Sequence, residues 1–246
     1  MGEKQMRTVV FTSDNHQWLL KGFLHQWHKY AGQGIEPLDL EVVGFTRPSF
    51  LPADVPFVSI GKFEDYPVQR WSNAVISYLQ SITDELVLIL LEDYWLMRPI
   101  NRAAIDEIKA LMLDHPHVVR FDVAADRMFS QHARYIGNVK NLDVCSAKGS
   151  YSLSFQASIW RRQMLLDVMR PDETPWQAEI NGSGRLNALP YGVVGTYQWP
   201  MNYMICMVKG KLDRTGSWMY PARTLSAMDW KELDNLGYTQ APEAAL

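Results

Sequence analysis

Cysteine is scarce in this sequence, because its 246 residues include only two, Cys145 and Cys206. The two lie far apart in the chain and form no Cys-x-x-Cys pair. A disulfide framework and a zinc site built from cysteines are therefore excluded, and such sparse cysteine is typical of a reducing compartment.

Long apolar runs are also absent. A charged or polar residue interrupts every apolar stretch before the roughly 18 residues that a membrane-spanning helix needs. The first segment, MGEKQMRTVVFTSDN, has too short an apolar run for the core of a signal peptide. We expect a soluble protein of the cytoplasm with no transmembrane segment, for which peripheral membrane contact remains open.

An excess of positive charge is the third absence. The chain has 24 Lys and Arg against 27 Asp and Glu, a formal charge of −3, so nucleic acid is not an expected partner. No Gly-x-Ser-x-Gly elbow, phosphate loop, Gly-x-Gly-x-x-Gly or His-Glu-x-x-His motif occurs. These absences argue against a hydrolase, an ATPase, a simple dinucleotide enzyme and a zinc protease.

Aromatic and other hydrophobic residues are abundant instead. Hydrophobic residues make up 47% of the chain, and nine of the aromatic residues are Trp. This composition predicts one globular domain over residues 1–246 with a large core. Buried aromatic rings carry much apolar area, whereas exposed rings stack on flat ligands. We expect Trp18, Trp27 and Trp160, which lie on or beside apolar helical stripes, in the core.

Strand and helix patterns alternate along the first half of the chain. Short apolar runs predict strands and helical spacing predicts helices; in order, these are a strand at 8–12, a helix at 18–30, strands at 40–45 and 56–60, a helix at 72–82, a strand at 86–91, a helix at 103–113 and a strand at 118–123. The alternation predicts an α/β fold, a single Rossmann-like mixed sheet with helices on both faces.

The pattern changes after residue 124. Alternation of apolar and polar residues predicts a half-exposed strand at 151–159, and a helix at 161–169 ends before Pro171. The stretch 173–184 is polar and aromatic, whereas 192–211 predicts one or two strands with a turn at Gly210. No linker divides the chain, so we expect the second half to complete the sheet.

Polar residues follow two of the predicted strands directly. Ser13-Asp14-Asn15 follows the first strand, and Glu92-Asp93 follows LVLILL, the most hydrophobic run. Ligands of open α/β sheets bind beyond the carboxyl ends of strands. Adjacent carboxylates beside a buried strand suit a divalent metal or the ribose and diphosphate of a nucleotide. A solvated strand end with a helix cap explains the same residues equally well.

Four segments in order resemble a known family; they are VVFTSDN, WSNAVISYLQSI, DELVLILLEDYWLMRPI and SYSLSFQASIWRRQMLLDVMRPDETPWQAEINGSGR. They are similar to the T-S-x-D, W-S-x, L-L-D-D-Y-F-L and S-L-Q-x-x-I-W-R with P-W-E-F-E patterns of glycosyltransferase-like proteins of the GT-A fold, found in bacterial and phage polysaccharide biosynthesis. The resemblance covers about residues 7–215, and implies a nucleotide-binding half at about 7–124 and an acceptor half at about 125–215.

The resemblance implies a nucleotide-sugar donor at the carboxyl edge of the sheet. The donor-binding residues that it implies are Thr12, Ser13, Asp14, Trp71, Ser72 and Glu92. Apart from the resemblance, Lys209 and Lys211 form a basic turn around Gly210 that suits the leaving phosphates of the donor. Glu92 and Asp93 occupy the place of the family's Asp-x-Asp metal motif, but Tyr94 stands at the third position. If a metal binds, Asp93 is the first-choice ligand, and Mg or Mn suits it. An ordinary hairpin turn facing water accounts for the two lysines as well.

Glycosyl transfer also needs a base and a surface for the acceptor. The resemblance implies that Glu179, the last carboxylate of PWQAE, is the base, with Glu173 in reserve, and that Asp93 shares the catalytic site. Apolar faces of sugar rings pack on flat π surfaces, so the acceptor is expected to contact aromatic residues; these are Tyr94, Trp95 and Trp176.

The leading hypothesis is therefore a glycosyltransferase, of hexosyltransferase type. It moves a sugar from a nucleotide-diphosphate donor to a saccharide or lipid-linked acceptor of a surface polysaccharide. Two alternatives remain open because one fold hosts many functions. One is a non-catalytic relative that binds a sugar or a protein, and the other is a nucleotidyltransferase.

Overall fold

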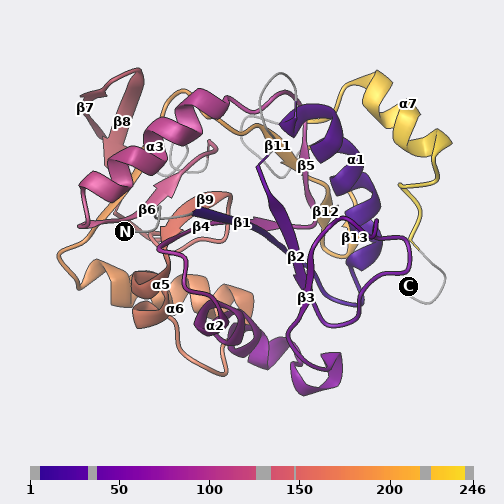
Figure 1. Cartoon of the computed structure of the whole chain (residues 1–246), viewed down its shortest axis with the longest axis horizontal. Helices are drawn as coiled ribbons and strands as arrows, with labels where there is room; N and C mark the ends of the chain where they lie inside the picture. Colours follow the sequence, from indigo (N-terminus) through magenta and orange to yellow (C-terminus); the bar gives the residue numbers. More distant parts are fainter. Residues whose placement is uncertain (1–5, 33–37, 126–133, 147, 217–222, 242–246) are drawn as a thin grey trace.

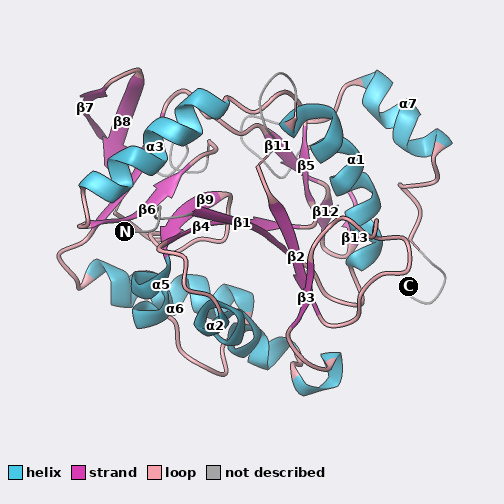
Figure 2. Ribbon diagram, viewed as in Figure 1, coloured by secondary structure: helices cyan, strands magenta, loops and turns pink. Residues whose placement is uncertain are grey.

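A mixed β-sheet forms the centre of the molecule (Figure 2). The computed structural model describes residues 6–32, 38–125, 134–146, 148–216 and 223–241. Within them, nine strands pair in the order β3-β2-β1-β4-β9-β6-β10-β8-β7. The strands are β1 (Met6–Phe11), β2 (Leu40–Gly44), β3 (Phe57–Ser59), β4 (Leu86–Leu91), β6 (Val118–Asp122), β7 (Arg134–Val139), β8 (Leu142–Ser146), β9 (Ser158–Arg161) and β10 (Gly192–Thr196).

Helices cover both faces of this sheet (Figure 1). On one face lie α1 (Leu20–Ala31), α3 (Arg102–Asp114) and α7 (Ala227–Asn235), and on the other lie α2 (Trp71–Ser81), α5 (Arg162–Val168) and α6 (Pro175–Asn187). Each face has its own cluster of buried hydrophobic residues. The predicted α/β class, a mixed sheet with helices on both faces, is confirmed.

Strand β4 shows why the most hydrophobic run lies at the centre. Leu88 and Leu90 pack into the core on the α1 side, whereas Val87 and Ile89 pack into the core on the α2 side. Side chains of a strand alternate between faces, so a strand covered on both faces must be apolar throughout. The sequence prediction of a central strand at 86–91 is confirmed.

The second half of the chain completes the sheet, as expected. Strand β9 pairs antiparallel with both β4 and β6, and β10 then pairs parallel with β6. Among the described residues, two small sheets lie outside the main one: β5 (Tyr94–Leu96) with β11 (Tyr203–Ile205), and β12 (Met207–Val208) with β13 (Lys211–Leu212). The same residues include short 3-10 turns at Gln17–Leu19, Phe63–Asp65 and Val68–Arg70. The structure places a turn at Gly210, where φ is 75°, as predicted.

The sequence prediction for the start of the second half was wrong, and one helix there was not predicted. The strand predicted at 151–159 forms only at Ser158–Arg161, because the preceding backbone is bonded to α6 instead: the Leu153 N–H donates to the Ser183 hydroxyl at 2.9 Å. The polar and aromatic stretch 173–184, for which no helix was predicted, is mostly α6. Thr174 caps that helix, and Pro175 occupies its first turn.

None of the helices in the described parts of the chain combines the length and hydrophobicity that crossing a bilayer requires.

Candidate active site

The carboxyl ends of β1 and β4 lie side by side at the centre of the sheet. These strands pair in parallel with Phe11 opposite Leu91, so Thr12 and Glu92 emerge together. The strand order runs from β3 through β2 to β1 and then reverses to β4. Such a reversal is a topological switch point, where open α/β sheets bind their ligands.

A cavity of about 570 Å³ opens at this point. Its walls come from the ends of β1 and β4, the start of α2, the segment before β9 and the first turns of α6. Of the residues predicted for a site, it is lined by Thr12, Ser13, Trp71, Glu92, Asp93, Tyr94, Trp176 and Glu179. One cavity thus brings together residues that are up to 167 positions apart in the chain, which the sequence prediction had grouped.

Two neighbouring acids of the cavity, Glu92 and Asp93, have perturbed pKa values. Burial raises the pKa of both carboxyl groups, and the charge of Asp93 raises the pKa of Glu92 further. The side chain of Glu92 is only 13% exposed. A basic group of the described chain, His16, has its Nδ1 4.0 Å from Glu92 Oε1, and burial lowers the pKa of His16, which favours the neutral ring. Perturbed acids in a cleft are typical of functional sites.

Charge in the cavity lining is carried by acids alone. Its carboxylates are Glu92, Asp93 and Glu179, and none of the described residues that line it is Lys or Arg. Nor do the described residues gather three or more His, Cys, Asp or Glu side chains able to hold a metal. Two neighbouring carboxylates nevertheless fit Mg²⁺, which proteins often hold through one or two carboxylates and phosphate oxygens of a substrate.

Glu179 and Trp176 reach the cavity from α6. Glu179 Oε1 accepts a hydrogen bond of 2.8 Å from the Phe155 N–H, which fixes the carboxylate at the cavity wall. Trp176 lines the same cavity and is 67% exposed. The sequence could have shown this helix, because Thr174-Pro175 followed by Gln177 is a capping-box signature.

An aromatic group in the cavity wall was not predicted. Phe45 lies just beyond β2, with its ring centroid 5.4 Å from that of Phe63 and 5.5 Å from that of Tyr66. All three residues line the cavity. They come from loops beyond β2 and β3, and only their position just after short strands could have pointed to a ligand edge.

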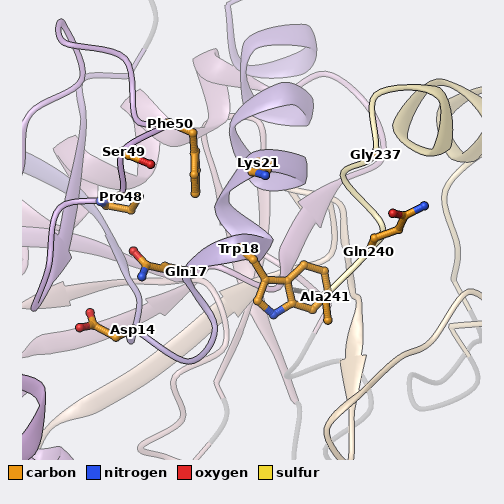
Figure 3. A pocket seen from close by; sticks show the side chains of 10 residues that line it. All are labelled: Asp14, Gln17, Trp18, Lys21, Pro48, Ser49, Phe50, Gly237, Gln240 and Ala241. Carbon is orange, nitrogen blue, oxygen red and sulfur yellow. The ribbon is translucent and has the colours of Figure 1, made fainter. Parts of the chain in front are cut away.

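Asp14 and Ser72 do not line this cavity. The carboxylate of Asp14 accepts hydrogen bonds from the Thr46 N–H at 3.0 Å and hydroxyl at 2.8 Å, and it lines a second cavity (Figure 3). Ser72 is fully buried, and its hydroxyl accepts from the Glu173 N–H at 3.0 Å. Ser72 therefore connects α2 to the chain before α6.

Lys209 and Lys211 are exposed at the turn between β12 and β13. They do not line the cavity, although Met207 of the same hairpin does. Lys209 has a left-handed backbone, with φ of 50°, as tight turns require. This placement agrees with the ordinary hairpin turn that the sequence also allowed.

Trp95 belongs to the core, and its predicted contact with an acceptor is wrong. The ring is fully buried, and its Nε1–H donates to the Leu19 carbonyl at 3.2 Å. It packs so closely on α1 that a Cβ added at Gly22 would lie 2.3 Å from the ring. Tyr94 does line the cavity, but only 4% of it is exposed, and its ring stacks on Tyr203 at 4.5 Å.

Glu173, the reserve base, is held away from the cavity. Arg185 donates to both of its oxygens, at 3.0 and 2.7 Å, and Asn181 donates to Oε1 at 3.0 Å. Burial opposes ionisation of Glu173, but these hydrogen bonds outweigh it and lower its pKa. A carboxylate so firmly paired is a structural group and a poor base.

No protein-family model and no curated protein matches this sequence. Among solved structures, the chain is similar to S. aureus TarS 1-349, with 14% identity, a TM-score of 0.47 and coverage of 78% of this chain and 57% of that one. It is also similar to UDP-glucose pyrophosphorylase, with 10% identity, a TM-score of 0.47 and coverage of 82% and 93%. A third is CMP:2-keto-3-deoxy-manno-octonic acid synthetase complexed with CTP, with 12% identity, a TM-score of 0.42 and coverage of 78% and 88%.

The chain thus spans little more than half the length of the TarS fragment. At these identities the likeness concerns the arrangement of the chain and not its activity.

Proposed function

We propose that this protein is a GT-A-like glycosyltransferase that moves a sugar from a nucleotide-diphosphate donor to a saccharide or lipid-linked acceptor of a surface polysaccharide. One observation carries the proposal: the cavity at the β1–β4 switch point has Glu92 and Asp93 at the strand end and Glu179 on α6. Transfer needs two functions, steadying of a leaving diphosphate and removal of a proton from an acceptor. Glu92 and Asp93 suit the first function, through a cation, and Glu179 suits the second.

The donor would lie along the sheet edge. A nucleobase suits the aromatic group of Phe45, Phe63 and Tyr66 in the cavity wall, because bases stack on aromatic rings. The ribose and diphosphate would then pass Thr12 and Ser13 toward the carboxylates. This orientation is supported by the residues that the cavity wall combines, aromatic rings from the loops beyond β2 and β3 and carboxylates at the end of β4.

Donor binding would need a divalent cation, because the donor and the cavity lining are both negatively charged. A diphosphate is anionic, and the described lining offers carboxylates and no Lys or Arg to receive it. Asp93, with Glu92 next to it in the chain, would hold Mg or Mn, and the cation would supply the positive charge that offsets the negative charge of the leaving diphosphate. Burying these carboxylates without a basic side chain beside them is costly. A metal ion that arrives with the substrate would offset that cost.

Glu179 would accept the proton of the acceptor hydroxyl. As that oxygen bonds to the anomeric carbon, the bond from that carbon to the diphosphate oxygen breaks and the nucleoside diphosphate leaves. Trp176, exposed beside Glu179, offers a flat face for the acceptor sugar, and Tyr94 lies deeper in the same cavity. The lining favours this reaction over nucleotidyl transfer, because a triphosphate adds negative charge where no Lys or Arg is found among the described lining residues.

The first test is a thermal-shift screen of UDP-, GDP-, CMP- and dTDP-sugars, each with and without Mn²⁺. A ligand that binds only the folded state stabilises it by about 2.7 kcal/mol at a hundred times its Kd. We expect one nucleotide sugar to raise the melting temperature by several degrees, and only with the metal. No shift with any of them at millimolar concentration would contradict the proposal.

Two substitutions separate the roles of the carboxylates. Asp93→Asn should remove the metal-dependent shift and lower transfer at least about 100-fold without lowering the melting temperature, since it removes a buried charge. Glu179→Gln should keep the shift and lose turnover. Asp54→Asn, at an exposed acid outside the cavity, is the matched control and should change neither. Full turnover in Glu179→Gln would exclude this residue as the base.

A further inference from the structure

A second cavity, of about 460 Å³, opens on the other side of the loop after β1 (Figure 3). It is bounded by the start of α1, the loop after β2 and the chain that follows α7. The residues that matter here are Asp14, Gln17, Trp18, Lys21, Phe50 and Gln240. None of its lining residues also lines the first cavity.

One loop separates the two cavities. Ser13, Asn15 and His16 line the first cavity, whereas Asp14 and Gln17 line the second. Asp14 is held in place by Thr46, from the loop after β2. The loop after β1 therefore forms a wall of the second cavity that the hydrogen bonds to Thr46 hold in place. This wall is made of folded backbone rather than of a single side chain.

Gln17 brings an unsatisfied polar group to this wall. Its Oε1 is buried, and among the described residues it has no hydrogen-bond partner. Burying a carbonyl oxygen without a hydrogen-bond donor costs free energy. If the Gln17 amide turned toward the cavity, its oxygen would accept a hydrogen bond from a ligand hydroxyl and recover that free energy. Such a group is expected where a hydroxyl is to be bound.

Lys21 supplies a donor at the opposite side of the cavity. Its ammonium lies 5.1 Å from the centroid of the Phe50 ring, and in the described part of the chain it forms no ion pair with a carboxylate. Figure 3 shows Lys21 and Phe50 facing the cavity above Gln17 and Trp18. The ring contact holds the lysine near the cavity and leaves its N–H groups able to donate.

The lining selects a ligand by shape and hydrogen bonding and not by charge. It contains one carboxylate, on Asp14, and one ammonium, on Lys21, so the two charges balance. Flat rings on Trp18 and Phe50 suit the apolar face of a pyranose, while Gln17, Lys21 and Gln240 suit its hydroxyls. A phosphate or other anion finds no surplus of positive charge here.

We infer that the second cavity binds a neutral saccharide unit, with its ring against Phe50 and Trp18 and its hydroxyls bonded to Lys21 and Gln17. This site does not depend on the proposed transfer reaction, because its residues are separate from Glu92, Asp93 and Glu179. It would hold a glycan chain against the protein next to the first cavity, with the loop at residues 13–17 between the two sites.

The experiment is saturation-transfer-difference NMR on the full chain. The probes are the methyl β-glycosides of glucose, galactose and N-acetylglucosamine, with methyl β-glucuronide as the anionic match to the glucoside. We expect transfer to the ring protons of at least one neutral glycoside, and no gain for the glucuronide over the glucoside. The inference is overturned if no neutral glycoside receives transfer, or if the glucuronide binds more tightly.

Variants assign the binding to this cavity. Lys21→Met and Phe50→Ala should each weaken binding about tenfold, the effect of losing one hydrogen bond or a ring contact. Asp93→Asn and Trp176→Ala, in the first cavity, should leave it unchanged. Lys21→Met keeps the test decisive if Phe50→Ala unfolds. Binding that survives Lys21→Met, or that is lost in Trp176→Ala, overturns the assignment, whereas loss of transfer activity alone does not bear on it.

Discussion

Two groups of buried carboxylates differ in what surrounds them. Glu173, before α6, receives hydrogen bonds from Arg185 and Asn181, and its pKa is lowered. Glu92 and Asp93, at the end of β4, have no Lys or Arg beside them among the described cavity residues, and their pKa values are raised.

The difference separates a structural acid from a functional one. Removing a charge from water is costly, and the fold offsets this cost for Glu173 with a guanidinium of its own. It leaves the cost uncompensated at β4, on the wall of a cavity, where a cation from solution can offset it. The three predictions below test this contrast, starting with the largest expected effect.

Arg185→Met should destabilise the protein by about 2–3 kcal/mol, because it leaves Glu173 buried and unpaired. Urea denaturation followed by circular dichroism would measure the loss. The double variant with Glu173→Gln is the control and should recover most of it, since a neutral amide tolerates the same burial. A loss below about 0.5 kcal/mol would mean that Glu173 is no better compensated than an exposed acid.

Glu92→Gln should stabilise the protein at about pH 8 by on the order of 1 kcal/mol. Burial and Asp93 raise the pKa of Glu92 above its ordinary value of 4.5, so the folded state holds this proton more tightly than the unfolded chain does. The stability that Glu92 contributes is therefore lost as pH rises from its ordinary pKa toward its raised pKa of about 8 in the folded state. Gln does not titrate, so the variant keeps its stability over this pH range. Urea midpoints of the parent protein and of Glu92→Gln, at about pH 4 and pH 8, measure this effect. If the two midpoints differ equally at both pH values, the raised pKa of Glu92 is contradicted.

Glu173→Gln should give the opposite and smaller pH dependence. The folded-state pKa of Glu173 is lowered, so its ion pair stabilises the protein above its ordinary pKa and is lost as pH falls through the lowered value. The variant should thus lose stability at about pH 7 and approach the parent protein at about pH 3. The same urea series measures this, and a penalty that grows toward acid would reverse the contrast.

Much of the first half was predictable from the sequence because its signals are local. Apolar runs and helical spacing show β1, α1, β4 and α3 without knowledge of their partners. The parallel sheet then brings the residues after β1 and β4 together, so Thr12 and Glu92 could be placed at one edge in advance.

The errors depend on contacts with residues far away in the chain. Trp95 is buried because β5 pairs with β11, where Met204 lies opposite it, and no pattern near Trp95 shows that partner. The donor contact of Asp14 stays a prediction; its carboxylate bonds to Thr46, from the loop after β2, and lines the second cavity. Helix α6 is a different case, since its capping box was visible in the sequence but its weakly apolar pattern was not typical of a helix.

Strand β9 has a consequence for the growing chain. It joins β4 to β6, yet residues 158–161 are made long after both of those strands. During synthesis the run LVLILL therefore has one unpaired edge, with free N–H and C=O groups, until β9 arrives. Such edges template aggregation of nascent chains. A chain stopped before residue 158 would expose the most hydrophobic strand of the protein to its neighbours, so translation that pauses in this interval is where chaperones would be needed most.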